Sequence, residues 1–515
     1  MLEFMDKFLE ENLQEVFSKA RLGFEKESLR VKDKKLAQTK HPDFLGSSLC
    51  NRFITTDFSE SQLELITKPV TGNQSAIEML ENIHHFISSK LNDDELIWPH
   101  SMPPCNLDEN EIQIAKFGSS YEGQFKHIYR KGLACRYGKI MQSISGFHFN
   151  YSLPDSVWSD IYRLKSEDIK SNRSEFYLNM IRNILEINWL IIYLFGASPI
   201  ISKSLVKRNE DSFISLEDDL FLLPEATSLR MSEYGYSNTK RRLSISVNSL
   251  DEYISDLVQA TKTIEPEYLK HEESNNSQLN ANILQIEAEY YAVARAKSNL
   301  NIFSRPTSNL KESGIDFIEI RSLDLDPFSR IGIKKETVLF FELLMIFCCI
   351  KKSQRLEKRD LTEISFNDIT VAKFGRKSKI HLSKKGDNVL LKDWGIEILE
   401  QMEQITDLMT DEKEDYLCVL RSMRSRINDP NKTTSGMLMK ELKEQNMSFT
   451  ELGVSLSKSY KDFYQSIKPS ENPLWQELEE ESKKSHLLQL EMESMDKASN
   501  MDLEIYKSQV NEVNR

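Results

Sequence analysis

The chain has 515 residues, and its 80 Asp and Glu against 67 Lys and Arg give it a formal net charge of −13. An acidic chain without basic blocks argues against a nucleic-acid-binding surface, because such surfaces take their affinity from Lys and Arg. The six cysteines never form Cys-x-x-Cys, which disfavours a zinc site and a redox pair, and six cysteines in so long a chain do not indicate a disulfide scaffold.

Read from the N-terminus, the chain predicts helices and strands in alternation, followed by a mainly helical C-terminal part. Apolar residues predict helices over 1–20, 73–91, 125–138, 172–195 and 335–350. Strand-like alternation covers 23–31, 55–66, 145–152, 283–289 and 317–323. Residues 98–105, 223–236 and 295–314 are expected to be loops. After residue 391 we expect helices with a break at 428–430, the last of them an exposed, charged helix over 475–515.

The chain also predicts a compartment. Its first 19 residues contain no apolar segment of the signal-peptide type. The longest apolar run, Trp189 to Ile201, is shorter than the roughly 20 residues that span a bilayer, and it contains Gly196 and Pro199. Cys348 and Cys349 lie in an apolar helical run and are expected to be reduced core residues. We therefore expect a cytoplasmic protein without a membrane partner.

Five segments alternate polar and apolar side chains with the period of two that is typical of a strand. In the first, Glu25 and Glu27 share one face, while Phe24 takes the other. The polar faces of the other segments carry Asp57, Glu60 and Glu64; His148 and Asn150; Gln285, Glu287 and Glu289; and Glu319 and Arg321. A lone Glu-x-Glu is more often a solvated strand face. Five such segments predict an α+β fold with a curved antiparallel sheet whose concave face is polar and binds metal.

Clustered carboxylates with one histidine suit a hard cation such as Mg²⁺, which takes oxygen ligands and binds phosphate-bearing substrates. Arg321 lies two residues from Glu319, and this fits phosphoryl transfer, in which a guanidinium stabilises charge on the moving group. Alternatively, Arg321 forms only a salt bridge with Glu319, and His148 is a buried core histidine. The glycine-rich nucleotide loops and the kinase catalytic loop are missing, so any ATP would be held by metals and a sheet face.

Six sequence blocks, in order, resemble the proteobacterial type of glutamate–cysteine ligase (γ-glutamylcysteine synthetase). They are RLGFEKESLRV at 21–31, ITTDFSE at 54–60, WPHSMP at 98–103, SGFHFN at 145–150, YLFGASP at 193–199 and FIEIRSLD at 317–324. The resemblance implies a fold similar to the catalytic part of glutamine synthetase, a funnel-shaped antiparallel sheet surrounded by helices. It also implies the first step of glutathione synthesis, in which ATP, L-glutamate and L-cysteine give γ-glutamylcysteine, ADP and phosphate.

The same resemblance implies roles for individual residues. The implied magnesium ligands, for which manganese can substitute, are Glu25, Glu27, Asp57, Glu64, His148 and Glu319. Arg321 resembles the residue that stabilises the transferred phosphoryl group, and Arg295 and Lys297 are candidates to contact ATP. The amino-acid site is implied to comprise Phe58, Tyr129, Leu133, Gln142, Tyr236 and Tyr291, with Arg130 and Arg230 as anchors for substrate carboxylates.

We expect two parts in the chain. Residues 1–330 would form the catalytic sheet funnel with its surrounding helices, and residues 331–515 a mainly helical part packed on the same body. The loops 223–240 and 295–314 are candidates to cover the funnel and keep water from an acyl phosphate. A monomer with glutathione as feedback inhibitor is expected from the resemblance.

Other functions compete with this one. A related carboxylate–amine ligase could join glutamate to another small amine. A noncatalytic glutathione or amino-acid sensor could keep the funnel, although all six implied metal ligands are present. A bifunctional enzyme that also makes glutathione is disfavoured, because only a short helical stretch is expected after residue 450.

Overall fold

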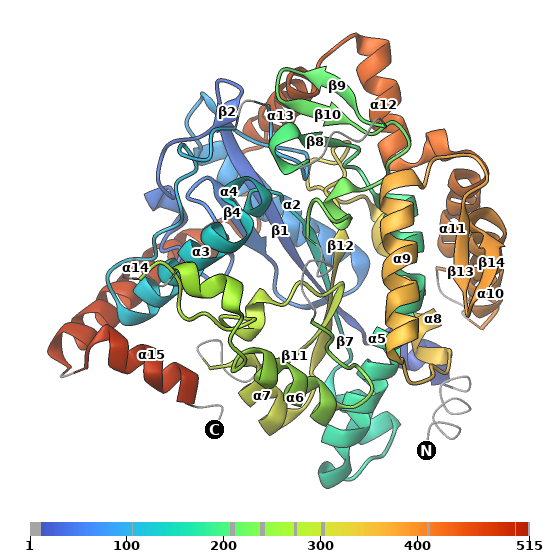
Figure 1. The fold of residues 1–515 in the computed structure, drawn as a ribbon, viewed down its shortest axis with the longest axis horizontal. Coiled ribbons are helices and arrows are strands. Elements are labelled where there is room, and N and C mark those ends of the chain that lie inside the picture. The colour runs from blue at the N-terminus through green and yellow to red at the C-terminus, as the bar shows by residue number, and fades with distance from the viewer. Residues whose placement is uncertain are drawn as a thin grey trace.

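The computed structural model describes residues 12–105, 107–206, 212–236, 243–271, 276–299, 304–408, 412–499 and 501–512. An antiparallel sheet lies at the centre of the molecule, and helices from both parts of the sequence surround it (Figure 1). The predicted α+β class with an antiparallel sheet is therefore confirmed.

The main sheet has the strand order β11-β12-β7-β1-β4-β3, and the short strands β2, β5 and β6 also pair with β1. Its strands are β1 (Arg21–Lys32), β2 (Lys35–Leu36), β3 (Ile54–Thr56), β4 (Gln62–Ile66), β5 (Val70–Thr71), β6 (Glu95–Ile97), β7 (Phe147–Ser152), β11 (Ala294–Lys297) and β12 (Phe317–Leu323). Two smaller sheets comprise β8 (Ile200–Ser202), β9 (Ile214–Glu217) and β10 (Leu220–Leu222), and the hairpin of β13 (His381–Lys384) and β14 (Asp387–Leu390).

The longer helices enclose this sheet (Figure 1). They are α2 (Asn73–Lys90), α3 (Tyr121–Tyr137), α5 (Ser166–Phe195), α6 (Leu250–Ala260), α8 (Lys335–Ile350), α9 (Lys358–Phe374), α10 (Leu391–Thr406), α11 (Lys413–Asn428), α12 (Thr434–Gln445), α13 (Phe449–Gln465), α14 (Trp475–Ala498) and α15 (Leu503–Glu512). Shorter helices are α4 (Lys139–Gln142) and α7 (Pro306–Ser313).

The apolar face of the sheet packs on α5 and α8. The Phe24 ring of β1 contacts Phe147 and Phe149 of β7 with centroids 5.3 and 5.7 Å apart, and Phe149 contacts Phe341 of α8 at 5.0 Å. Burial on this side fixes the register, because a shift by one residue would turn Glu25 and Glu27 into the core. The opposite face of β1, which carries Glu25, is thereby held towards the interior cavity described below.

Helix α5 is long and apolar enough to cross a membrane by composition, but 89% of its most apolar window is buried inside the protein. It is the central core helix, as the sequence predicts for 172–195. The prediction of a helix apolar on all sides over 335–350 is also confirmed, since α8 has the same bounds. Cys348 and Cys349 are buried, free thiols as expected.

The structure corrects several predicted elements. Residues 283–289 do not form a strand, and only Glu287–Glu289 forms a short 3₁₀ turn. The sheet strand in this region is β11, which overlaps the start of the stretch 295–314 predicted as a loop, and α7 occupies the end of that stretch. Residues 12–17 are helical, while the rest of the predicted helix 1–20 falls largely outside the described residues, as do 237–240 and 300–303 of the predicted covering loops.

A buried carboxyl group at the interface of α5 and α9 leads to a pH prediction. Asp368 accepts a hydrogen bond from the Asn188 amide at 2.8 Å, and burial raises its pKa to about 8. A carboxyl group with a raised pKa in the folded state stabilises the fold fully below its ordinary pKa, and this stability is lost as the pH rises towards 8. We expect Asp368 to lower the free energy of unfolding by about 1.4 kcal/mol per pH unit over this interval.

Urea unfolding of the wild type and of Asp368→Asn between pH 5 and 8 measures this dependence. The asparagine variant should show a flatter pH profile and gain stability relative to the wild type as the pH rises. Asp393→Asn on the exposed side of α10 is the matched control and should leave the profile unchanged. Parallel profiles for the wild type and Asp368→Asn would contradict the prediction.

Candidate active site

One cavity of about 240 Å³ opens on the polar face of the main sheet. All seventeen residues predicted as site residues line it: Glu25, Glu27, Asp57, Phe58, Glu64, Tyr129, Arg130, Leu133, Gln142, His148, Arg230, Tyr236, Tyr291, Arg295, Lys297, Glu319 and Arg321. These residues come from segments up to nearly 300 positions apart in the sequence, and the fold brings them together around one cavity.

Strand pairing places the charged side chains in a row across the sheet. Arg295 of β11 is paired with Glu319 of β12, and Glu319 is paired with Asn150 of β7. Further along, Glu25 of β1 is paired with His148, and Glu27 with Glu64 of β4. The row therefore runs from basic residues at β11, through mixed charges, to carboxylates at β4.

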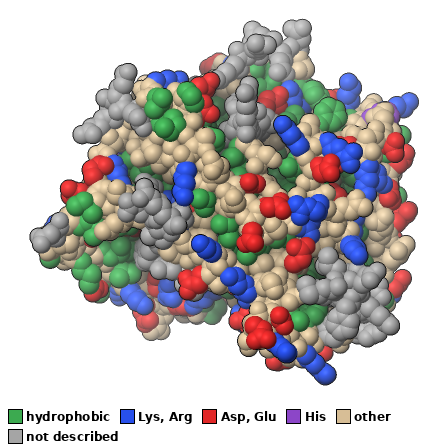
Figure 2. Space-filling model, turned by 60° about the horizontal axis from the view of Figure 1, so that its bottom comes forward, with side chains coloured by type: hydrophobic (Ala, Val, Ile, Leu, Met, Phe, Trp, Pro, Cys, Tyr) green, Lys and Arg blue, Asp and Glu red, His purple; other side chains and the backbone are tan. Residues whose placement is uncertain are grey.

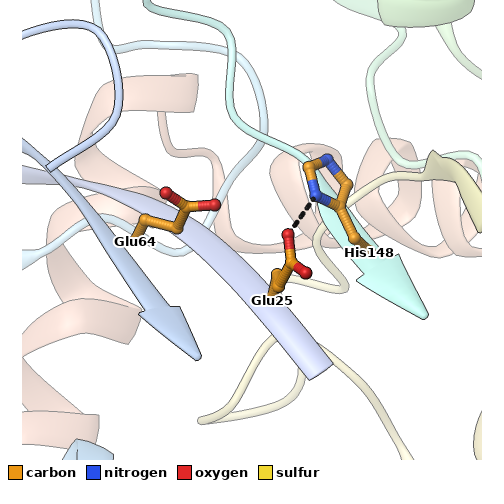
Figure 3. Close-up of side chains that lie close together, drawn as sticks. All are labelled: Glu25, Glu64 and His148. Atoms are coloured by element: carbon orange, nitrogen blue, oxygen red, sulfur yellow. Dashed lines mark hydrogen bonds and ion pairs between the residues drawn. The ribbon is translucent and has the colours of Figure 1, made fainter. Parts of the chain in front are cut away.

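The acidic end of this row contains a group that could hold a metal ion. Glu25, Glu64 and His148 each offer a ligand atom, and these three atoms lie within 4.8 Å of one another. Figure 3 shows the three side chains on neighbouring strands, with Glu25 between the other two and a contact of 3.3 Å joining its Oε2 to Nδ1 of His148. Carboxylate oxygens with one imidazole nitrogen are a donor set that fits Mg²⁺ or Mn²⁺.

Glu27 and Glu319 flank this group on either side of His148. The His148 Nε2 atom lies 3.5 Å from Glu27 Oε1, and its Nδ1 atom lies 3.7 Å from Glu319 Oε1. Glu319 is fully buried, and its Oε2 atom makes no hydrogen bond to any described residue. A buried carboxylate oxygen without a hydrogen bond is costly, so this atom is a further position at which a cation would be stabilised.

The two ends of the row differ in electrostatics. Burial raises the pKa of Glu27 to about 8, with the Asp57 carboxylate adding to the effect. Burial and the same neighbour raise the pKa of Glu64 well above its ordinary value. At Glu319 burial acts in the same direction, but Lys297 and Arg321 outweigh it and hold the pKa well below the ordinary value. The carboxylates near Asp57 therefore repel one another, and a divalent cation would relieve that repulsion.

Arg321 lies between the acidic end and the basic end of this row of side chains. Its Nη1 atom donates to Glu319 Oε1 at 3.1 Å and lies 3.4 Å from His148 Nδ1. The simple salt bridge considered for Arg321 is thus present, yet the same guanidinium also lines the cavity. Lys297 Nζ lies 3.5 Å from Glu319 Oε1, and Arg295 Nη1 lies 4.0 Å from Glu319 Oε2. Three cationic groups therefore converge on one buried carboxylate beside open space.

An aromatic and amide wall closes another side of the cavity. Tyr236 and Tyr291 form an edge-to-face pair with centroids 5.0 Å apart. The Gln142 amide donates to the Tyr291 hydroxyl at 2.6 Å, and the Tyr236 hydroxyl donates to the Ile144 carbonyl at 3.0 Å. With Leu133 beside them, these groups form a small, partly apolar wall that can contact a short side chain.

Two further arginines are held in place by protein groups. Arg130 donates from Nε to the Asp57 carbonyl, and its guanidinium stacks over Phe117 at 4.3 Å from the ring centroid. Arg230 donates from Nη2 to the Arg321 carbonyl at 2.8 Å, and its Nη1 lies 3.6 Å from the buried Asp324. Because both guanidinium groups are fixed before any ligand arrives, they are suited to bind a carboxylate in one orientation.

Three acidic residues predicted on polar strand faces do not belong to the cavity lining. Glu60 accepts hydrogen bonds from the backbone of His41 and Lys116 at 2.8 and 2.9 Å. Glu287 pairs with Arg305 at 2.6 Å, and Glu289 pairs with Arg136 at 3.0 Å. These buried ion pairs hold the segment that carries Tyr291, so their role is structural.

Sequence reasoning missed four lining residues, Met231, Ala288, Ala292 and Val293. Each lies beside or close to a predicted site residue, and none carries a chemical group that would single it out. The strand β11 could have been found, because Ala294 and Ala296 alternate with Arg295 and Lys297. Both alanines are buried in the core, and both basic residues face the cavity.

Comparison with known proteins assigns the family. A family model for glutamate–cysteine ligase matches residues 5–371. The chain is similar to glutamate–cysteine ligases from Alcanivorax borkumensis, at 39% identity over 86% of this chain and 87% of that protein, and from a Janthinobacterium strain, at 38% identity over 88% and 87%. It is also similar to a crystal structure of glutamate–cysteine ligase from Francisella tularensis in complex with AMP, at 34% identity and a TM-score of 0.88, covering 96% and 98% of the two chains.

A second solved structure shares the fold alone. A bifunctional glutathione synthetase from Pasteurella multocida superposes with a TM-score of 0.67 at 24% identity, and the match covers 89% of this chain and 53% of that one. Together with these matches, the antiparallel sheet and the charged cavity on its polar face identify an enzyme, a ligase. The chain belongs to the glutamate–cysteine ligase family.

Proposed function

We propose that this protein joins the γ-carboxylate of L-glutamate to the amine of L-cysteine, with ATP converted to ADP and phosphate. Family membership supports this activity. The observation that carries it is the cavity in which Arg321, Lys297 and Arg295 face the cluster of carboxylates around His148. The cationic groups suit phosphates, and the carboxylates suit the cations that accompany phosphates.

Magnesium is the cofactor that we propose, with manganese able to replace it. The residues that would hold it are Glu25, Glu27, Asp57, Glu64, His148 and Glu319. The converging donors of Glu25, Glu64 and His148 and the Oε2 atom of Glu319, which lacks a hydrogen bond among the described residues, support this ligand set. When bound, the metal would neutralise negative charge on the phosphates of ATP.

The proposed chemistry has two steps. A γ-carboxylate oxygen of glutamate attacks the γ-phosphorus of ATP, the bond to the bridging β–γ oxygen breaks, and ADP leaves with γ-glutamyl phosphate formed. The cysteine amine then attacks the acyl carbon, loses a proton, and phosphate leaves. Arg321 is proposed to donate hydrogen bonds to the moving phosphoryl oxygens, because charge there is greatest in the transition state. Arg295 and Lys297 are proposed to contact ATP.

The amino-acid substrates are proposed to bind at the opposite wall. Arg130 and Arg230 are proposed to bind substrate carboxylates. Phe58, Tyr129, Leu133, Gln142, Tyr236 and Tyr291 are proposed to surround cysteine. The edge-to-face pair of Tyr236 and Tyr291 supports this, because together with Leu133 it gives the cavity an apolar wall that suits a short side chain. Holding three substrates in one cavity supplies much of the rate by positioning.

The test is a coupled assay of purified protein with Mg²⁺, ATP, glutamate and cysteine. ADP release should require both amino acids, and mass spectrometry should detect γ-glutamylcysteine. Each amine in a series, including ammonia, alanine, 2-aminobutyrate and cysteine, should be compared at equal concentration. Faster turnover with an amine other than cysteine would favour the related carboxylate–amine ligase. Absence of ADP formation with every amine would favour a noncatalytic sensor.

Gly146→Ala tests the placement of Arg230. A Cβ atom at Gly146 would lie 2.1 Å from Arg230 Nη2, so the guanidinium must move. We expect the KM for one of the two amino acids to rise about tenfold, which corresponds to about 1.4 kcal/mol of lost binding. Steady-state kinetics with each substrate varied in turn measures this change.

Gly23→Ala is the matched control. It lies on β1, and the nearest atom to its added Cβ is 3.6 Å away, an ordinary contact. Its kinetics should stay close to those of the wild type. If Gly146→Ala and Gly23→Ala gave the same kinetics, the position of Arg230 would not matter for substrate binding.

Further properties are proposals on the same basis. We propose a cytoplasmic, monomeric enzyme that is inhibited by its pathway product glutathione; the presence of all seventeen predicted site residues at the cavity of one chain supports the monomer. We also propose that residues 1–330 and 331–515 fold as one body. The contact of Phe149 with Phe341, which joins the two parts inside one core, supports this.

A further inference from the structure

A second, smaller cavity lies on the other side of strand β1. It has a volume of about 20 Å³, and residues of β1, β6, α2, α13 and the loop that follows β12 line it. Lys26 of β1 reaches this cavity from the face opposite to Glu25 and Glu27, because successive side chains of a strand alternate. The space holds about one water molecule or one ion of similar size.

The ammonium group of Lys26 makes few contacts for a buried charge. The residue is 2% exposed, and its Nζ atom donates one hydrogen bond to Nε2 of His84 at 2.9 Å. Burial and the neighbouring Lys26 hold the pKa of His84 well below its ordinary value, so the imidazole accepts this bond as a neutral group. The other N–H bonds of the ammonium group have no acceptor among the described residues. Lys26 therefore brings a positive charge to the cavity without a carboxylate partner.

A second donor at this cavity comes from Arg330, in the loop after β12. Its Nε atom is buried and makes no hydrogen bond to any described residue. Its Nη2 atom donates to Glu81 Oε1 at 3.4 Å, while the other oxygen of Glu81 accepts from the Tyr464 hydroxyl. The loop packs directly on Lys26, since a Cβ atom at Gly332 would lie 2.8 Å from Lys26 Cε. Lys26 and Arg330 thus face the same small space.

The acceptors around the cavity are used by other groups. Glu95 is the one carboxylate among the described residues that line it, and it accepts from Arg30 at 2.7 Å and from Thr39 at 2.6 Å. Lys461, a third basic residue of the lining, donates to the carbonyls of Asn92 and Glu95. On the molecular surface, by contrast, Figure 2 shows basic and acidic side chains intermingled. The cavity therefore has a surplus of positive charge and of N–H donors.

We propose that this cavity binds one chloride ion, held by the ammonium group of Lys26 and the guanidinium group of Arg330. A buried ammonium group without a counter-charge is costly, and an anion removes that cost. Phosphates and carboxylates are too large for a space of about 20 Å³. Water beside a neutral Lys26 amine is the other occupant that this size allows. The proposal goes beyond the proposed catalytic function, since no described residue lines both cavities.

Bromide, which scatters anomalously and is close to chloride in size, tests the site directly. Crystals of the full-length protein soaked in sodium bromide should show an anomalous peak in the cavity, within hydrogen-bond distance of Lys26 Nζ. Lys26→Met keeps a long side chain but removes the charge, so it should lose this peak. Lys373→Met is the matched control and should keep it, because Lys373 is a buried lysine that donates to Glu233 at 2.8 Å.

Thermal melting at constant ionic strength tests binding in solution. Replacing sodium gluconate, whose anion is too large for the cavity, with sodium chloride should raise the melting temperature of the wild type by about 1–2 °C more than that of Lys26→Met. General effects of the two salts are shared by all variants, so Lys373→Met should respond as the wild type does. Arg330→Gln changes a side chain that is 39% exposed, so it keeps the test open if Lys26→Met does not fold. It should at least halve the chloride response.

Three results would overturn the proposal. A cavity that contains only water in the bromide-soaked wild type would assign a neutral amine to Lys26. A bromide peak that persists in Lys26→Met would show that the ammonium group does not hold the anion. Equal melting responses of the wild type, Lys26→Met and Arg330→Gln to chloride would mean binding at crystal concentration only.

Discussion

Arg321→Ala is expected to lower kcat by about 10³-fold or more while the KM values for glutamate and ATP change by less than about threefold. The reason is the position of the guanidinium, which lies 3.1 Å from Glu319 and faces the cavity beside the carboxylate cluster. A group in this position gains most when charge accumulates on the transferred phosphoryl oxygens, which happens in the transition state and not in the ground state. Rapid-quench measurement of γ-glutamyl phosphate formation, together with steady-state kinetics, separates the two contributions.

Arg321→Lys is the informative companion variant. It keeps the charge near Glu319 but loses the planar, two-pronged donor, so we expect activity between that of the wild type and that of Arg321→Ala. Arg355→Ala is the matched control for loss of an arginine ion pair, because Arg355 pairs with Glu252 at the surface and lies outside the catalytic cavity. A rise in substrate KM with unchanged kcat in Arg321→Ala would assign the residue to binding alone.

The part of the site that could be predicted from sequence follows from the alternation of side chains along a strand. In β7 apolar side chains alternate with His148 and Asn150, and in β1 Phe24 and Glu25 lie on opposite faces. Burial of Phe24 and Phe149 fixes which face carries Glu25 and His148. A local pattern is enough here, because the period of a strand determines the face. The partner strands are not determined locally, so the order of β7, β1 and β4 in the sheet required the structure.

The failure at residues 283–289 shows the limit of that rule. Apolar residues at 284, 286 and 288 alternate with Gln285, Glu287 and Glu289, as they would in a true strand. In the structure Glu287 and Glu289 pair with Arg305 and Arg136, which are 18 and 153 residues away in the chain. Partners at such distances leave no local signal, so alternation alone predicts a strand that does not form. The true strand β11 shows the same alternation over four residues only, so a search for longer segments missed it.

Composition predicts that the C-terminal region is helical and charged, but it does not predict how these helices pack. A charged helix over 475–515 is confirmed in part by α14 and α15, which are separate helices. A helix on a protein surface usually turns its apolar residues towards the body. Helix α14 follows this rule only in part: Leu478 is buried, but Glu481, Ser482 and Ser485 also face the body and form hydrogen bonds with loops of the N-terminal part. Such polar complementarity depends on the shape of the receiving surface and is not visible in one sequence.

Tyr236→Ala is expected to raise the KM for cysteine by about 30- to 100-fold and to change the KM for ATP by less than about threefold, since an aromatic contact surface worth about 2–3 kcal/mol is lost. The Tyr236 ring packs edge to face on Tyr291, and its hydroxyl donates to the Ile144 carbonyl at 3.0 Å. Without the ring, water gains access to the cavity wall. We therefore also expect more ADP to form than γ-glutamylcysteine, because water competes with the cysteine amine for γ-glutamyl phosphate.

Tyr236→Phe separates the ring from the hydroxyl. It keeps the contact with Tyr291 and loses only the contacts of the hydroxyl with the Ile144 and Gln142 carbonyls at 3.0 and 3.3 Å, so the KM for cysteine should rise by less than about fivefold, with one ADP still formed per product molecule. Tyr460→Phe, whose hydroxyl donates to the Pro327 carbonyl at 2.7 Å outside the cavity, is the control for loss of a buried tyrosine hydroxyl. Parallel measurement of ADP and γ-glutamylcysteine over a range of cysteine concentrations distinguishes the role of the ring from that of the hydroxyl. If Tyr236→Ala kept the cysteine dependence and the ADP-to-product ratio of the wild type, the aromatic wall would not be where cysteine binds.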